Sequence, residues 1–133
     1  MLHLNWLAVM TAAISSFALG GFWYSSALFG RAWMSVNNFT DTDLAKRNMV
    51  KIFGLSFIFM VIMAANLAAF LNEPKTDASW GATAGFLAGF GWVALGIATI
   101  ALFERRSWKY ILINGGYVTT SFIVMGLILG TWR

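Results

Sequence analysis

Residues 78–103 read ASWGATAGFLAGFGWVALGIATIALF and contain no Asp, Glu, Lys or Arg. A helix needs roughly 20 mostly apolar residues to cross a bilayer, so this stretch is long enough to span one. Three other stretches, residues 1–30, 52–72 and 110–132, are equally free of those four residue types. Charged residues make up only 11% of the chain, whereas a soluble domain typically contains about 25%. The pattern therefore predicts four transmembrane helices.

We expect an all-α fold, a four-transmembrane-helix bundle that forms a single integral membrane domain over residues 1–133. The predicted helices lie at about residues 5–29, 50–71, 79–103 and 109–131. Thr40 with Asp43 three residues later is typical of a helix N-cap followed by an acidic first turn. The second helix is therefore expected to begin near Asp41, ahead of its span. The first residues lack the basic segment of a signal peptide, so we expect the first helix to be retained.

The basic residues predict the orientation of the helices. Seven of the nine Lys and Arg residues lie in or beside the loops at 30–50 and 104–109, and they are Arg31, Lys46, Arg47, Lys51, Arg105, Arg106 and Lys109. Only Lys75 and Arg133 lie on the opposite side. Short cytoplasmic loops carry an excess of Lys and Arg, so we expect both loops to be cytoplasmic and both termini to be outside. Basic residues at these positions meet lipid head groups, which accounts for the net charge of +4 without a nucleic-acid partner.

Glycines recur at four-residue spacing in two of the predicted helices. Gly81, Gly85 and Gly89 share a face of the third helix, with Gly96 continuing near it, and Gly126 and Gly130 repeat the spacing in the fourth. Small residues let helix backbones approach closely in a membrane. The glycines therefore indicate packing within the bundle or between subunits, with a pore-lining face as the functional alternative. We expect a homo-oligomer that forms through these glycine faces.

The fourth predicted helix carries a polar stripe. Tyr110, Asn114, Tyr117 and Ser121 recur at i, i+4, i+7 and i+11 and so share one face. An amide that faces lipid costs roughly several kcal/mol, so these groups and Asn66 are expected to point into the bundle. They could form interhelical hydrogen bonds, worth about 0.6–2 kcal/mol each, or orient a ligand. The candidate ligand-binding residues are Asn66, Asn114, Tyr117 and Ser121, with Trp23 and Tyr24 as walls.

The densest charge cluster lies in the third loop. Glu104, Arg105 and Arg106, with Lys109 and Arg31 nearby, could anchor the topology, or bind an anionic head group or substrate at the inner leaflet. We expect no metal site, cofactor or catalytic residue, because the chain has no cysteine and His3 is its only histidine. No charged residue lies at mid-membrane depth, which argues against a proton relay or an ion-coupled transporter.

Several short motifs together resemble a known family. They are NWLAV at residues 5–9, GFWYS at 21–25, ALFGRAWM at 27–34, LFERR at 102–106, INGGY at 113–117 and the final Trp132 and Arg133. Nearly the whole chain is similar to a family of short bacterial membrane proteins catalogued as domain of unknown function seventeen-sixty-one. The pattern of that family usually shows a proline after the Tyr-Ser pair, where this chain has Ser26. The resemblance implies four spans in a bacterial cytoplasmic (inner) membrane, and no assigned activity.

Three functional hypotheses follow from these observations. The leading one is a non-enzymatic membrane protein that binds or passes a small, weakly polar or lipid-like molecule, because the spans are uncharged but carry amide, phenol and hydroxyl groups. The second is a membrane enzyme that acts on a lipid or conjugate at the inner surface through Glu104 and Arg105. The third is a structural or accessory subunit whose glycine faces meet a partner. Membrane lipids are expected partners in each case.

Overall fold

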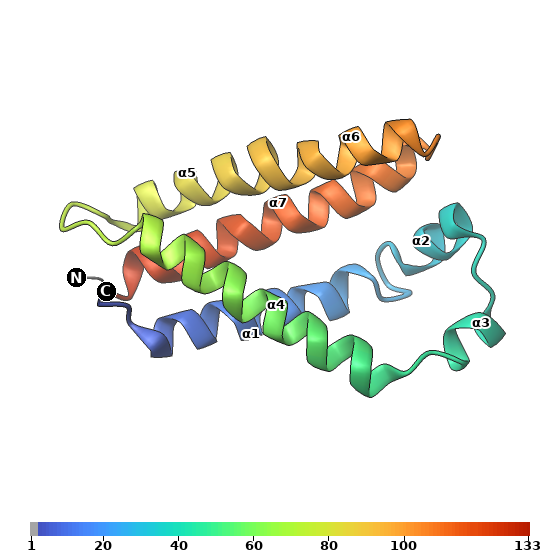
Figure 1. The fold of residues 1–133 in the computed structure, drawn as a ribbon, viewed down its shortest axis with the longest axis horizontal. Coiled ribbons are helices and arrows are strands. Elements are labelled where there is room, and N and C mark those ends of the chain that lie inside the picture. The colour runs from blue at the N-terminus through green and yellow to red at the C-terminus, as the bar shows by residue number, and fades with distance from the viewer. Residues whose placement is uncertain (1–2) are drawn as a thin grey trace.

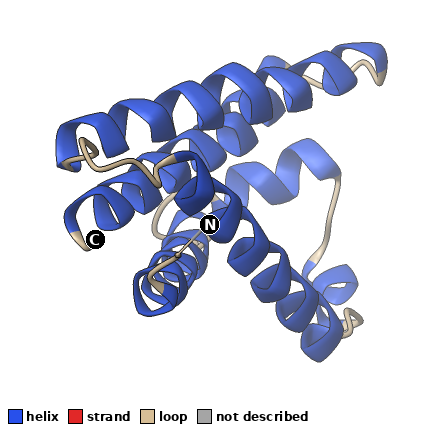
Figure 2. Ribbon diagram, turned by 60° about the vertical axis from the view of Figure 1, so that its left-hand side comes forward, coloured by secondary structure: helices blue, strands red, loops and turns tan. Residues whose placement is uncertain are grey.

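The computed structural model describes residues 3–133, and these residues form only helices and turns (Figures 1 and 2). In chain order the elements are α1 (Trp6–Trp23), α2 (Gly30–Asn37), α3 (Asp41–Ala45), α4 (Met49–Phe70), α5 (Ala78–Ala88), the π-helical segment η1 (Gly89–Ala94), α6 (Leu95–Phe103) and α7 (Trp108–Thr131). Within the described residues, α1, α4, the continuous α5–η1–α6 helix and α7 are each long and apolar enough to cross a membrane. The predicted all-α, four-helix fold is confirmed.

The four long helices form a bundle with two distinct ends. Residues 3 and 133, the first and last that the structure describes, lie at one end, which we call the terminal end, and α2, α3 and the α6–α7 turn lie at the other (Figure 1). The Asn5 side chain, which is the N-cap of α1, lies 3.5 Å from the Trp132 carbonyl oxygen at the terminal end. Both ends of the chain therefore share one side of the bundle, as an even number of crossings requires.

The first helix is shorter than predicted. It ends at Trp23 rather than near residue 29, and a turn leads from there into α2. The Ser25 hydroxyl donates to the Phe22 carbonyl oxygen at 2.6 Å, a side-chain bond that competes with continuation of the helix. The Gly30 backbone N–H then donates to the Ser25 carbonyl oxygen at 2.9 Å. A Cβ at Gly30 would collide with the carbonyls of Tyr24 and Ser25, so this turn requires glycine. The chain breaks here without a proline, since the sequence contains only Pro74.

The predicted N-cap at Thr40 is confirmed, but it begins a separate helix. The Thr40 hydroxyl accepts from the Asp43 N–H at 3.1 Å, and the Asp43 carboxylate accepts from the Thr40 N–H at 2.9 Å. The hydrogen bond from the Thr40 backbone holds the pKa of Asp43 below its usual value. This helix, α3, stops at Ala45, and α4 starts afresh at Met49 with Asn48 as its N-cap. The second span therefore does not begin near residue 41.

The glycines join α5 and α7 within one chain. A Cβ at Gly81 would overlap the Gly126 carbonyl oxygen, and a Cβ at Gly126 would overlap that of Gly81. Gly85 lies in the same way against the Phe122 carbonyl, and Gly130 against that of Asp77. The two backbones therefore touch along much of their length. This face is occupied inside the chain, so it does not supply the oligomer interface that the sequence predicted, and self-association would need another surface.

Gly96 does not continue the glycine face. Nothing lies within 4 Å of a Cβ built there, and the same is true of Gly91. The reason is η1, which adds a residue to one turn and so rotates every later position by about 100° relative to an unbroken α-helix. Beyond such a segment, the spacing of residues in the sequence no longer predicts which of them share a helix face with those before it.

The packed core lies toward the terminal end, and α4 diverges from it at the other end. All buried residues of α4 lie in its last two turns, at Ala64, Leu67 and Ala68. The following Leu71 is also buried, and its carbonyl accepts a hydrogen bond from Arg133 at 2.5 Å. Toward α2 and α3 the helix separates visibly from α7 in both ribbon views (Figures 1 and 2). Residues of α1, α2 and the first half of α4 line a cavity on this side of the bundle.

Candidate functional site

The polar stripe of α7 faces α1, and side chains from both helices meet there. The Tyr24 hydroxyl donates to the Asn114 side-chain oxygen at 2.7 Å, and the Tyr117 hydroxyl donates to the Ser16 carbonyl oxygen at 2.9 Å. The hydroxyls of Ser16 and Ser121 are also in direct contact in the buried interface. These bonds join α1 and α7 where no lipid could satisfy the same groups.

Trp23 completes this group at the end of α1. Its indole N–H donates to the Ile113 carbonyl oxygen at 3.0 Å, and its ring lies against Phe29 with a centroid separation of 4.9 Å. Five of the six candidate ligand-binding residues are thus brought together, and they are Trp23, Tyr24, Asn114, Tyr117 and Ser121.

Asn66 is not part of this group. Its side chain is exposed on the outer surface of α4, and its amide donates to the Ile62 carbonyl oxygen of the same helix at 2.9 Å. The expectation that Asn66 points into the bundle is therefore wrong. The carbonyl one turn earlier supplies a partner for one of its donors, which lowers the cost of facing outward.

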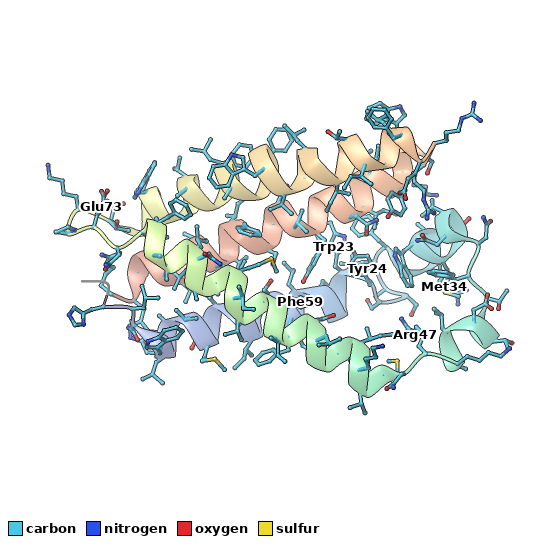
Figure 3. All side chains as sticks on the ribbon, in the orientation of Figure 1. Trp23, Tyr24, Met34, Arg47, Phe59 and Glu73 are labelled. Atoms are coloured by element: carbon cyan, nitrogen blue, oxygen red, sulfur yellow. The ribbon has the colours of Figure 1, made fainter. Side chains whose placement is uncertain are left out.

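A large cavity opens beside these polar groups. It has a volume of about 1150 Å³ and lies between α1, α2, α3, the first half of α4 and α7. We call it the α2–α4 cavity, and its lining includes Phe17, Gly20, Gly21, Tyr24, Arg31, Trp33, Met34, Asp41, Arg47, Ile52, Phe53, Ser56, Met60, Asn114 and Tyr117. Tyr24, Met34 and Arg47, which come from three different segments, border this space in Figure 3.

The polarity of the lining changes along the cavity. On the side of α1 and α4 the lining is mainly apolar, with Phe17, Phe53 and Met60. The Phe17 ring meets the Phe53 ring edge to face at a centroid distance of 5.7 Å, which holds α1 and α4 together at this depth. The charged residues of the lining, Arg31, Asp41 and Arg47, come from α2 and from the segment around α3, and Tyr24, Asn114 and Tyr117 form one side wall. The cavity is therefore amphiphilic.

The polar side wall keeps unused hydrogen-bonding capacity. Tyr24 spends its only hydroxyl proton on Asn114, which leaves the oxygen lone pairs of Tyr24 and the amide protons of Asn114. The Tyr24 and Tyr117 rings meet edge to face at 5.4 Å, so both phenols have fixed positions. Trp33 of α2 packs on Tyr24 at 5.8 Å and extends this aromatic wall toward the end of the cavity.

The sequence did not single out several residues that line this cavity. Phe17, Phe53 and Met60 are apolar residues within apolar spans, and nothing in their spacing distinguishes them from neighbours that face lipid. The sequence distinguishes Arg47 only as a charged residue of a loop, and it does not indicate that Trp33 lines a cavity.

The predicted head-group cluster is divided by α2. Glu104, Arg105 and Arg106 line a second, polar cavity of about 700 Å³ with Lys109, between the end of α2 and the α6–α7 turn. Arg106 donates to the Asn37 side-chain oxygen at 3.3 Å, and its guanidinium carbon lies 4.8 Å from the centre of the Tyr110 ring. Arg31 lies apart from these residues, in the α2–α4 cavity.

Arg105 has an unusual backbone in this turn. Its φ of 62° is in the left-handed region that favours glycine. This conformation ends α6, and the Arg106 N–H donates to the Ala101 carbonyl oxygen at 2.8 Å across the helix end.

Among residues 3–133, no three His, Cys, Asp or Glu side chains lie close enough together to hold a metal ion.

A family model described as "Protein of unknown function (DUF1761)" matches residues 7–130. The match confirms the resemblance stated from the short motifs. No curated protein matches the chain, and no solved structure does.

Proposed function

The chain belongs to the DUF1761 family, whose function is unknown, and from that premise we propose that it is a non-enzymatic membrane protein that binds or passes a small lipid-like molecule. The α2–α4 cavity is the observation that carries this proposal. Its volume of about 1150 Å³ slightly exceeds the range of roughly 300–1,000 Å³ typical of small-molecule sites. The ligand would lie between α1 and the first half of α4.

The chemistry of the walls supports a lipid-like ligand rather than a fully polar one. Phe17, Phe53 and Met60 would contact an apolar tail, whose transfer from water contributes about 0.8 kcal/mol per buried CH₂. Tyr24 and Asn114 would orient a weakly polar group by the lone pairs and amide protons that their mutual hydrogen bond leaves. Ser121 and Trp23 would hold α7 and α1 in place rather than touch the ligand, because neither lines the cavity.

Photo-cross-linking tests this proposal at residue level. A single-tailed amphiphile with a diazirine on its tail would be added to the protein in phosphatidylcholine nanodiscs, and the adducts would be mapped by peptide mass spectrometry. We expect saturable labelling at Phe53 and Met60, which excess unlabelled amphiphile removes. Outward-facing Ile100 and Leu112, which are 63% and 70% exposed, serve as controls for labelling from bulk lipid. Labelling that is equally non-saturable at all four positions would rule the cavity out as a binding site.

We also propose that the cavity faces the inner leaflet of a bacterial cytoplasmic membrane, with both termini outside. The support is that α2, α3 and the α6–α7 turn share one end of the bundle (Figure 1) and that seven of the nine basic residues lie in or beside these segments. The excess of Lys and Arg in short cytoplasmic loops gives the direction.

The absence of cysteine makes this orientation testable with single-cysteine variants. In intact cells, a membrane-impermeant maleimide should label Lys75→Cys, between α4 and α5, and should label Lys46→Cys only after the membrane is permeabilised. Both side chains are exposed, so accessibility within the protein does not differ between them. The reverse pattern would invert the proposed topology.

A further inference from the structure

We infer that the head group of the ligand is anionic and is held by Arg47 together with Arg31, an inference that rests on the proposed function. Arg47 is the only one of the nine Lys and Arg side chains that is half-buried, and the other eight are exposed. It lies between the end of α3 and the start of α4 and lines the α2–α4 cavity. In Figure 3, Tyr24 and Met34 lie on other sides of the same cavity.

The guanidinium of Arg47 keeps most of its hydrogen-bonding capacity. A guanidinium has five N–H donors in a planar fork. Within residues 3–133, the side-chain bond found for Arg47 is that from its Nε to the Leu44 carbonyl oxygen at 3.2 Å, which leaves the four Nη protons. This bond fixes the side chain against α3. A half-buried guanidinium that is already positioned is suited to a carboxylate or phosphate, which it can bind through two parallel hydrogen bonds.

The charge balance of the lining favours an anion as well. Arg31 of α2 and Arg47 are its cations, and Asp41 at the start of α3 is its single carboxylate. The remaining polar residues of the lining are hydroxyl, phenol and amide groups. The cavity thus carries one net positive charge, and an anionic head group would neutralise it.

The apolar wall along α4 sets the length of the tail. Ile52, Phe53, Ser56 and Met60 line the cavity along α4, and the helix rises 1.5 Å per residue. From Ile52 to Met60 this corresponds to roughly 12 Å. A head group at Arg47 would therefore place a single alkyl chain along Phe53 and Met60 on α4, beside the contact between the Phe17 and Phe53 rings. The ligand class is a single-tailed carboxylate or phosphate monoester.

Competition against the diazirine probe in phosphatidylcholine nanodiscs tests this inference. The competitors would be dodecyl phosphate, dodecanoate, dodecanol and dodecyltrimethylammonium, which share one tail, and inorganic phosphate, which has none. We expect the two anionic amphiphiles to compete at concentrations about tenfold or more below that of dodecanol, and the cationic amphiphile to compete least. In Arg47→Gln the ratio between dodecanol and dodecyl phosphate should fall to within about twofold, and Arg47→Lys should keep part of it.

A matched control is the neighbouring Lys46→Gln. Lys46 carries the same charge but is exposed and does not line the cavity, so its loss should leave the ratio as in the unmodified chain. Equal competition by all four amphiphiles would overturn the anionic head group and leave the binding proposal standing. Competition by none of them would overturn the binding proposal itself. Equal competition by inorganic phosphate and dodecyl phosphate would show a site for free anions and would overturn the claim that the cavity binds an alkyl tail.

Discussion

Replacing Gly126 with leucine is expected to destabilise the α5–α7 pair by about 3 kcal/mol or more, at or above the upper end of what overpacking usually costs. A Cβ at this position would overlap the carbonyl oxygen of Gly81 and lie 2.7 Å from the carbonyl carbon. Because these atoms belong to backbone, no side-chain rotation can relieve the collision. The two helices would have to separate, and they would lose the close contact that holds them together without a hydrophobic driving force.

The loss of stability is measured by heating the protein in detergent and quantifying the remaining folded protein by size-exclusion chromatography. The control is Gly96→Leu, since Gly96 is also helical and has nothing within 4 Å of its Cβ position. We expect a strong loss of folded, monodisperse protein for Gly126→Leu and a nearly unchanged profile for Gly96→Leu. Equal stability of the two variants would mean that the α5–α7 backbones do not touch as described.

Replacing Gly21 with tryptophan is expected to reduce saturable labelling of the α2–α4 cavity at least tenfold. Gly21 lines the cavity, and nothing lies within 4 Å of a Cβ built on it. The Cβ of a tryptophan would therefore meet no protein atom, and we expect its indole to occupy part of the cavity. The reason for the loss is steric, so it should affect charged and neutral amphiphiles alike, in contrast to Arg47→Gln.

Gly54→Trp is the matched control for this prediction. Gly54 also has an open Cβ position, but it lies on α4 outside the cavity lining and faces outward. The variant should fold and should bind the amphiphile as the unmodified chain does. If the two tryptophan variants retain the same labelling of Phe53, the cavity is not where the ligand lies.

The sequence predicted the spans well because the charge-free runs reflect the high cost of placing a charged side chain inside a bilayer. The segments at 50–71, 79–103 and 109–131 agree with the structure to within a residue at each end. The end of α1 could not be predicted, because the break depends on a local hydroxyl bond of Ser25 and on the close approach that Gly30 permits. The π-helical turn η1 likewise has no composition that distinguishes it from an α-helix.

The candidate site was predicted only in part, for a reason specific to membranes. The helical period of Asn114, Tyr117 and Ser121 placed them on one face, and burial cost placed that face inside the bundle. The same logic failed for Asn66, whose own helix supplies a partner. Apolar wall residues such as Phe53 could not be found at all, because lipid is as apolar as a protein core and leaves no pattern that separates the two.

Native mass spectrometry of the protein released from nanodiscs that contain dodecyl phosphate tests the central claim most directly. The account predicts one bound amphiphile per chain in the unmodified protein and in Gly54→Trp, and none in Gly21→Trp. The same distribution of bound amphiphile in all three proteins would contradict it.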